Sequence, residues 1–305
     1  MKMLFLRDFH GATGGHLKYR NYLDHTKRIP GIEPELYLTP ASLTDISNPF
    51  LASGVPIRKH LTASASYFVA GTDWKWLDAA GIDLRGKPVV NLVQHVSHAD
   101  PSDPKFTYLA RPALRICVSA AVAEALSATG RVTGPIVTIE NGIDIGHITA
   151  TMTPSVRSGV FIAGYKALDL GRAIAMRLRQ SVDVDLAEAF VPRDEFLKRV
   201  TRARLCVLLP HAKEGFYLPA LEAMALGTPV IVPDCIGNRS FCLHGDTCLV
   251  PEFNVAAITQ AAMQLHDGVD LAKELVRGGH AMAKRHSLAR EEEEYTIALS
   301  KYLGS

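Results

Sequence analysis

Two carboxylates frame the segment Glu214-Gly-Phe-Tyr-Leu-Pro-Ala-Leu-Glu222, with seven residues between them. The preceding run, residues 204–210, is apolar and ends in proline, which predicts a short buried strand. From Pro219 onward strong helix formers follow, so a helix is expected to start there with Glu222 in its opening turn. Gly227-Thr-Pro-Val-Ile-Val-Pro233 then predicts a helix stop and a second buried strand. The segment therefore predicts a corner that leads from a strand through a loop into a helix.

The start of this helix is suited to an anion, because unpaired N–H groups there coincide with the positive end of the helix dipole. The residues whose backbone N–H groups are expected to be unpaired are Gly215, Phe216, Tyr217 and Leu218. One of the two carboxylates can then accept hydrogen bonds from ribose hydroxyls while the other faces a sugar. The alternative is that Glu222 only complements the helix dipole and that Glu214 is a solvated loop residue.

The stretch from Glu214 to Pro233 resembles the signature of retaining, nucleotide-sugar-dependent glycosyltransferases with the GT-B fold, of the group 1 or family 4 type. The resemblance implies an α/β protein with two Rossmann-like, doubly wound parallel-sheet domains that face a cleft. It also implies that Glu222 binds the donor ribose and that Glu214 lies against the donor sugar as a catalytic residue. The backbone of residues 215–218 would meet the diphosphate and the sugar.

Length and composition agree with two ordinary domains, since 305 residues are about two domain lengths and 48% hydrophobic residues can fill two cores. The charges nearly cancel at +2, so no nucleic-acid partner is expected. The five cysteines lack zinc-ligand spacing and are expected to be small core residues. Neither a metal site nor a cofactor is expected.

The sequence has no apolar run that approaches the length of a membrane span, and the apolar run at residues 3–6 is too short for a signal peptide. We therefore expect a soluble, cytoplasmic protein without a transmembrane segment. A peripheral membrane contact stays open, because many members of the resembled family use lipid-linked acceptors. The oligomeric state cannot be predicted from the sequence.

Predicted strands alternate with helical segments in two successive sets, which favours parallel sheets covered by helices on both faces. The first set covers residues 3–7, 35–38, 67–70, 88–95, 115–119 and 136–140, and the second covers 159–163, 182–187, 205–209, 228–232 and 247–250. A boundary is expected near residues 148–156, where the stretch 149–155 has neither period nor apolar content. The predicted domains are an acceptor-side domain at 1–150, a donor domain at 151–286 and a final helix at 287–305. The residue pattern predicts that Glu291 to Glu294 on this helix lie mostly in water, and by resemblance the helix crosses back to the first domain.

A glycine-rich loop follows the first predicted strand and includes Gly14, Gly15 and His16. Glycines allow a helix N-terminus to approach a ligand closely, but the spacing Gly-x-x-Gly-Gly is not the dinucleotide-binding pattern. The resemblance implies that Gly14 and Gly15 reach the donor phosphates and sugar. His16 is a second-tier candidate.

His95 is predicted to end the strand at residues 88–95, at a position where open α/β sheets usually bind ligands. In the resembled family a His at a similar place assists the reaction or orients the donor sugar. The alternative for His95 is an ordinary packing or hydrogen-bonded residue. His98 and Asn141, the latter within Asn-Gly-Ile-Asp, are second-tier candidates by the same resemblance.

One departure from the family pattern concerns the diphosphate. Where relatives carry Gly-Arg-x-x-x-x-Lys-Gly, this chain has Tyr165 at the arginine position and Leu170 at the lysine position. Lys166 and Arg172 are candidates to supply charge from shifted positions, with Lys213 in the second tier. The alternative is that Lys166 is a solvated loop residue and Arg172 a helix-surface residue.

The function implied by the resemblance is a retaining, metal-independent transfer of a sugar from a nucleotide-sugar donor to an acceptor hydroxyl. The acceptor is open between a saccharide, a lipid-linked sugar, a protein and a small molecule. The missing Arg/Lys pair leaves a second reading, a degenerate glycosyltransferase that acts as a non-catalytic partner subunit. A nucleotide-sugar epimerase on the same fold is a third reading, without a distinctive residue pattern.

Overall fold

The computed structural model describes residues 1–11, 13–150 and 156–304. The chain divides into two compact units, unit 1 with Met1–Asn141 and Leu288–Ser305, and unit 2 with Gly142–Ser287. Part of the predicted boundary, residues 151–155, lies outside the described residues. Unit 2 begins before that segment because helix α4 (Ile145–Ala150) packs on helix α7 (Leu218–Ala225) of unit 2 and buries Ile148.

Unit 1 contains a six-stranded sheet in the order β2-β1-β3-β4-β5-β6, and every neighbouring pair is parallel. Its strands are β1 (Lys2–Arg7), β2 (Glu33–Leu38), β3 (Ser66–Ala70), β4 (Val89–Val93), β5 (Leu114–Cys117) and β6 (Ile136–Thr138). Its helices are α1 (Gly14–Thr26), α2 (Trp74–Ala79), η1 (Val96–Ala99), η2 (Pro104–Ala110), α3 (Ala120–Ala128) and α10 (Leu288–Leu303). The six strands predicted for the first half of the chain are thus confirmed.

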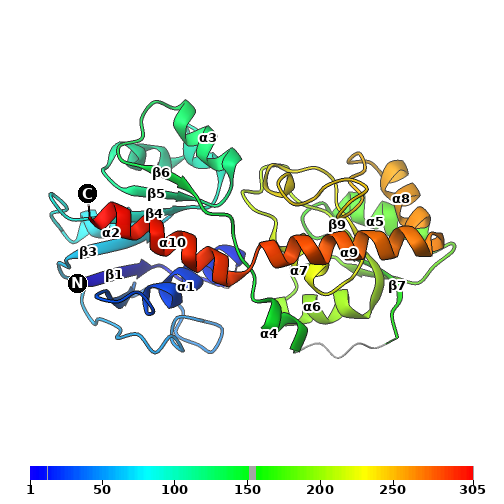
Figure 1. Cartoon of the computed structure of the whole chain (residues 1–305), viewed down its shortest axis with the longest axis horizontal. Coiled ribbons are helices and arrows are strands. Elements are labelled where there is room, and N and C mark those ends of the chain that lie inside the picture. The colour runs from blue at the N-terminus through cyan, green and yellow to red at the C-terminus, as the bar shows by residue number, and fades with distance from the viewer. Residues whose placement is uncertain (12, 151–155, 305) are drawn as a thin grey trace. The chain divides into compact units, whose positions relative to one another are not determined.

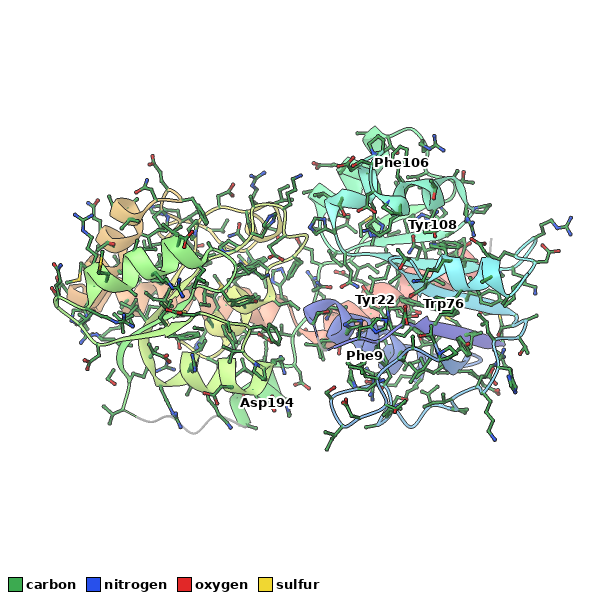
Figure 2. The ribbon with its side chains drawn as sticks, turned by 180° about the vertical axis from the view of Figure 1, so that it is seen from behind. Phe9, Tyr22, Trp76, Phe106, Tyr108 and Asp194 are labelled. Atoms are coloured by element: carbon green, nitrogen blue, oxygen red, sulfur yellow. The ribbon has the colours of Figure 1, made fainter. Side chains whose placement is uncertain are left out.

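Helices cover both faces of this sheet, because successive side chains of a strand point to opposite faces. On one face Leu4 and Leu6 pack in a cluster with Trp74 and Leu77 of α2. On the other face Phe5 stacks on Phe68 of β3, with ring centroids 4.5 Å apart, and aromatic residues of α1 and α10 surround the pair. Figure 2 shows the side chains of this unit, with Tyr22 of α1 labelled.

Unit 2 contains a four-stranded parallel sheet in the order β10-β9-β7-β8. Its strands are β7 (Ser158–Ala163), β8 (Val184–Ala187), β9 (Ala203–Leu208) and β10 (Val230–Ile231). Besides α4, its helices are α5 (Leu168–Leu178), α6 (Arg193–Arg202), α7 (Leu218–Ala225), η3 (Ile236–Asn238), α8 (Val255–Asp267) and α9 (Val269–Arg285). The fifth strand, predicted at residues 247–250, was wrong: Leu249 makes an isolated bridge to Ile231, whereas its neighbour Cys248 bridges locally to His244.

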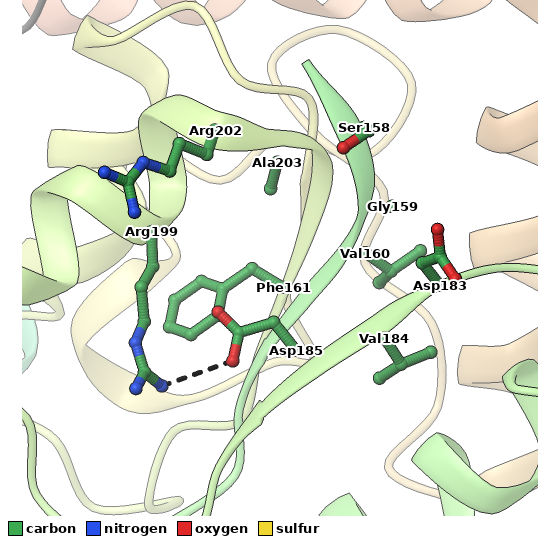
Figure 3. Close-up of a pocket in the computed structure, with 10 residues that line it drawn as sticks. All are labelled: Ser158, Gly159, Val160, Phe161, Asp183, Val184, Asp185, Arg199, Arg202 and Ala203. Atoms are coloured by element: carbon green, nitrogen blue, oxygen red, sulfur yellow. Dashed lines mark ion pairs between the residues drawn. The ribbon is translucent and has the colours of Figure 1, made fainter. Parts of the chain in front are cut away.

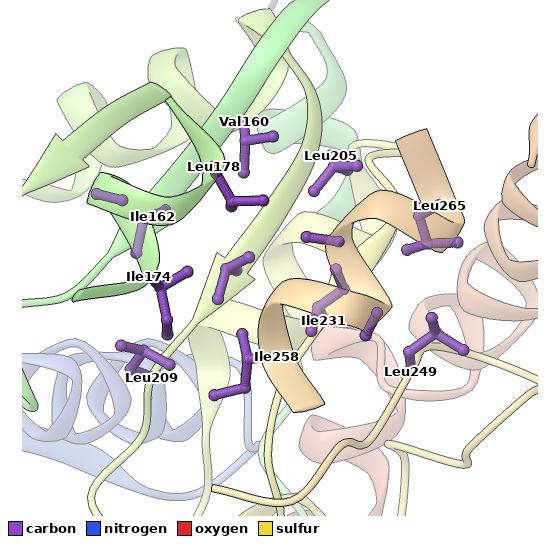
Figure 4. Close-up of a cluster of buried hydrophobic side chains, with 14 of the residues drawn as sticks. Val160, Ile162, Ile174, Leu178, Leu205, Leu209, Ile231, Leu249, Ile258 and Leu265 are labelled. Carbon is purple, nitrogen blue, oxygen red and sulfur yellow. The ribbon is translucent and has the colours of Figure 1, made fainter. Parts of the chain in front are cut away.

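The core of unit 2 lies between the sheet and helices α5 and α8 (Figure 4). Val160 and Ile162 of β7 face this core, while Phe161 between them packs on Phe196 of α6 at 5.8 Å, so helices lie on both faces here too. Gly171 lets α5 approach the sheet, since an added Cβ would come within 3.0 Å of the Gly164 Cα. Both sheets are therefore doubly wound, as the sequence predicted.

The C-terminal helix α10 belongs to unit 1, where it packs on α1. The expectation that Glu291 lies in water was wrong, because its side chain is fully buried. Glu291 Oε2 lies 2.5 Å from Lys18 Nζ, and Oε1 lies 3.0 Å from His25 Nε2. All five cysteines are buried and free, as expected. Within the described residues, no helix combines the length and apolarity needed to cross a membrane.

Candidate functional site

The strand order of unit 2 marks one place for a ligand. Connections from β7 run to β8 on one side and onward to β9 on the other, so the topological switch point lies between β7 and β9. Ligands of open α/β sheets bind outside the carboxyl ends of the strands at such a point. Lys166 follows β7 and Glu214 follows β9, and Lys166 Nζ forms an ion pair with Glu214 Oε1. Two residues that the sequence singled out separately are therefore in contact at the switch point.

Aromatic rings surround this ion pair. Lys166 Nζ lies 5.4 Å from the ring centroid of Tyr217 and 5.8 Å from that of Tyr165. Tyr165 in turn makes an edge contact at 6.0 Å with Phe190, which is 59% exposed. Burial raises the pKa of Tyr165, so its hydroxyl stays protonated and adds no negative charge beside Glu214.

Glu222 lies on α7 behind this corner. The helix starts at Leu218, so Glu222 belongs to its second turn rather than to the predicted opening turn. Its side chain is only 5% exposed, and Oε1 accepts a hydrogen bond from Arg193 Nε at 2.6 Å. A buried carboxylate needs such a partner, because removing its charge from water is costly.

Arg193 was missed by the sequence analysis. It begins α6 directly after Pro192, where a helix-start arginine has no distinguishing local pattern. Its contact with Glu222 joins residues from different βα connections, and only the fold brings them together.

The loop between the two carboxylates packs against the backbone of Gly237. A Cβ at Gly237 would lie 2.5 Å from the backbone N of Phe216, so only glycine fits there. The expectation of four unpaired N–H groups was wrong in part: Tyr217 N donates to Gly237 O at 2.8 Å, and Leu218 N to Phe216 O at 3.2 Å. Within the described part of the chain, the N–H groups of Gly215 and Phe216 donate no hydrogen bond. The side chains of residues 216–218 are buried, so any ligand contact from them comes from the backbone.

The remaining predicted cations differ from Lys166. Arg172 forms a bidentate ion pair with Glu188, in which Nε donates to Oε1 at 3.2 Å and Nη2 donates to Oε2 at 2.7 Å. About half of each side chain is exposed. Among the described residues, no hydrogen bond or ion pair joins Arg172 to Lys166 or Glu214. Lys213 lies in the loop before Glu214, and its backbone N donates to the His211 ring at 3.2 Å.

In unit 1 the predicted glycine-rich loop leads into α1. Thr13 caps the helix, and Gln94 Nε2, after β4, donates to Gly15 O at 3.3 Å. A Cβ at Gly15 would come within 3.1 Å of Gln94 Oε1, so glycine permits this close packing; Gly14, the first residue of α1, is exposed. His16 Nδ1 lies 3.0 Å from Thr13 Oγ1, and burial lowers the pKa of His16 to about 4, so the ring is neutral at pH 7.

The two later histidines occupy different environments. The strand β4 ends before His95, contrary to the prediction, because His95 caps η1: its Nδ1 accepts from Ser97 N at 3.0 Å, which places the proton of a neutral ring on Nε2. His98 is buried, and burial lowers its pKa to about 3. Asn141 is also buried, and its Oδ1 has no hydrogen-bond partner among the described residues.

A cavity of about 340 Å³ lies at the opposite, amino-terminal ends of β7, β8 and β9 (Figure 3). Asp183 and Asp185 line it, and Asp185 pairs with Arg199 at 3.4 Å. The segment Asp183-Val-Asp185 thus enters β8 at its amino end, away from the carboxyl ends at which parallel sheets bind ligands. None of the predicted site residues lines this cavity.

Comparison with known proteins bears on this arrangement. Residues 150–267 match the family model described as Glycosyl transferases group 1. No curated protein matches the chain significantly. HepE from Anabaena, solved with UDP-glucose, is 16% identical, with a TM-score of 0.74 over 99% of this chain and 100% of its own. Sucrose-phosphate synthase from Thermosynechococcus elongatus is 13% identical, with a TM-score of 0.71 over all of both chains.

A third similar structure is MnaA from S. aureus with UDP, 13% identical, with a TM-score of 0.65 over 99% of this chain and 97% of its own. At these identities the likeness to solved structures shows the fold, which is GT-B. The family match covers the helix corner around Glu214 and Glu222. The GT-B fold and the match to the glycosyl transferases group 1 model at residues 150–267 together support a glycosyltransferase.

Proposed function

We propose that the protein transfers a sugar from a nucleotide-sugar donor to an acceptor hydroxyl, with retention of the anomeric configuration and without a metal ion. The observation that carries the proposal is the contact of Lys166 with Glu214 at the switch point of unit 2, with the buried Glu222 beside it. UDP-glucose and UDP in the structures of HepE and MnaA support a nucleotide sugar as the donor.

Each part of the corner has a proposed role. Glu222 accepts hydrogen bonds from the ribose hydroxyls and is oriented by Arg193. The N–H groups of Gly215 and Phe216 and the ammonium of Lys166 face the diphosphate, which leaves with developing negative charge. Glu214 contacts the donor sugar.

The proposed reaction follows from these roles. The acceptor oxygen forms a bond to the anomeric carbon on the face from which the diphosphate departs, and the bond between that carbon and the diphosphate oxygen breaks. The departing diphosphate oxygen takes the proton of the acceptor hydroxyl. In unit 1, His95 is proposed to orient the donor sugar, and Gly14 and Gly15 to meet its phosphates.

A second candidate is a degenerate glycosyltransferase that serves as a partner subunit. The pairing of Arg172 with Glu188 favours it, because this arginine is then a poor replacement for the cation that the family pattern has at Tyr165. The ion pair of Lys166 with Glu214 speaks against it, because a scaffold needs no cation at the switch point.

Calorimetric titration with UDP, GDP and ADP and with UDP-glucose, GDP-mannose and ADP-glucose, each in EDTA, separates the two. The proposal expects one nucleotide and its sugar derivative to bind, followed by release of that nucleoside diphosphate in a coupled assay. Binding without turnover in any acceptor mixture would favour the partner subunit, and no binding across the set would contradict the proposed donor.

A further inference from the structure

The sheet of unit 1 has a switch point of its own. The chain passes from β1 to β2 on one side and then to β3 on the other side of β1, so the switch point lies between β1 and β3. The carboxyl ends of these two strands are where a parallel sheet offers a binding site. The glycines and histidines that the sequence singled out do not include the polar residues found there.

Groups from the ends of β1 and β2 and from helix α2 converge on the carboxylate of Asp8, the residue after β1. Thr39, the residue after β2, donates its hydroxyl to Asp8 Oδ1. His10 Nε2 lies 3.2 Å from the same oxygen, and Lys75 Nζ on α2 lies 3.6 Å from Oδ2. Burial alone would raise the pKa of Asp8, but hydrogen bonds from Thr39 and His10 lower it below its usual value. The carboxylate is therefore ionised at pH 7.

A buried pair supports this cluster from beneath. Asp73 is 1% exposed; it accepts a hydrogen bond from Ala70 N at 2.8 Å and pairs with Arg7 Nη1 at 3.2 Å. The Arg7 guanidinium also lies over the Tyr19 ring at 4.9 Å. These groups have partners inside the fold and hold the strand ends in place.

The groups above them are accessible to a ligand. The side chains of His10 and Lys75 are 62% and 51% exposed, and that of Asp8 is 15% exposed. The 3.6 Å between Lys75 and Asp8 exceeds a hydrogen bond, so both charged groups keep capacity for a further partner.

The charge balance selects the class of ligand. The two cations Arg7 and Lys75 are offset by the carboxylates of Asp8 and Asp73, so these four side chains carry no excess charge that would attract a phosphorylated molecule. A carboxylate beside an ammonium suits neighbouring hydroxyls, because one hydroxyl can donate to Asp8 while the next accepts from Lys75.

We propose that Asp8, His10 and Lys75 form the acceptor subsite and that it takes an uncharged saccharide. The inference rests on the proposed function, since an acceptor is needed only if a sugar is transferred. It narrows the acceptor from any hydroxyl compound to a neutral sugar.

The test separates the acceptor from the donor. Wild-type protein is first assayed for slow hydrolysis of UDP-glucose, UDP-galactose, GDP-mannose and ADP-glucose without acceptor; failure there speaks against the proposed function, not the subsite. With the hydrolysed donor, methyl α-D-glucopyranoside, methyl β-D-galactopyranoside and methyl α-D-mannopyranoside are compared with glucose 6-phosphate as acceptors.

The subsite predicts transfer to at least one methyl glycoside. Asp8→Asn and Lys75→Met should each raise the KM for that glycoside by about tenfold or more while donor hydrolysis changes by less than about twofold. Lys75→Met keeps the test valid if Asp8→Asn fails to fold, because Lys75 is half exposed. Lys2→Met, which removes an exposed lysine at the other end of β1, is the matched control and should leave both quantities unchanged.

Three results would overturn the subsite. In the first, the protein transfers sugar to glucose 6-phosphate but to no neutral glycoside. In the second, it hydrolyses the donor but transfers sugar to none of the four acceptors. In the third, folded Lys75→Met has an unchanged KM for the glycoside. A parallel loss of hydrolysis and transfer in both variants would also overturn it, because the residues would then act on the donor or on the fold.

Discussion

At the scale of single residues, Glu222 and Arg193 illustrate what local sequence can and cannot reveal. Glu222 could be predicted because the spacing from Glu214 and the helix start belong to one short segment. Arg193 could not, because its hydrogen bond to Glu222 depends on how α6 and α7 pack against each other. The paired N–H groups of Tyr217 and Leu218 were unpredictable for the same reason.

Glu222→Gln is expected to weaken binding of the nucleoside diphosphate by about 1.5–3 kcal/mol, because a charged acceptor of two ribose hydrogen bonds becomes a neutral amide. Calorimetry with UDP measures the change. Glu195→Gln on α6, whose side chain is 46% exposed, is the matched control and should leave the affinity unchanged. An unchanged affinity in Glu222→Gln would refute its assignment to the ribose.

Lys166 and Arg172 are expected to differ, although the sequence presents them as equal candidates. Lys166→Ala should lower turnover by roughly tenfold to a thousandfold, because it removes a cation beside the leaving diphosphate. Arg172→Ala should cost less, because Arg172 is exposed and paired with Glu188. Steady-state rates with a saturating donor decide between them, and a larger loss in Arg172→Ala would reverse the assignment.

At the scale of elements, apolar runs predicted the strands well because a buried parallel strand is recognisable from composition alone. The helix α10 was predicted with nearly its observed bounds, yet the environment of Glu291 was not. An acidic run is usually solvated, and only the packing of α10 on α1 gives Glu291 its partners Lys18 and His25.

Glu291→Ala should destabilise unit 1 by about 3–5 kcal/mol, because it leaves the Lys18 ammonium buried without its carboxylate. Glu293→Ala on the same helix is exposed and should change stability little. Urea unfolding of both variants measures their stabilities. Equal stabilities would contradict the proposed stabilisation of the contact between α10 and α1 by the ion pair of Glu291 with Lys18.

The stability that ionised Glu291 contributes between α10 and α1 should depend on pH. Burial alone would raise the pKa of Glu291, but the Lys18 charge and the His25 hydrogen bond lower this pKa below its usual value of 4.5. A carboxyl whose pKa is lowered by folding stabilises the protein above its unfolded pKa and loses this contribution as the pH falls through the folded pKa. The stability difference between wild type and Glu291→Ala should therefore be complete above about pH 5 and shrink in more acidic solution.

At the scale of the whole molecule, the alternation of strands and helices predicted two doubly wound sheets, and both are present. The helix corner could be located because its residues are contiguous, whereas the cluster around Asp8 draws Thr39 and Lys75 from separate connections. Polar residues drawn from two loops and a helix have no shared sequence pattern, so this cluster could not be predicted.

The central claim is retaining sugar transfer from a nucleotide sugar without a metal ion. Proton NMR of UDP-glucose, GDP-mannose and ADP-glucose, incubated with the protein and EDTA, observes the first sugar product before its anomers equilibrate. These donors carry α-linked sugars, so the account predicts an initial product in the α configuration together with free nucleoside diphosphate. An initial β product, a reaction abolished by EDTA, or no consumption of any donor would contradict it.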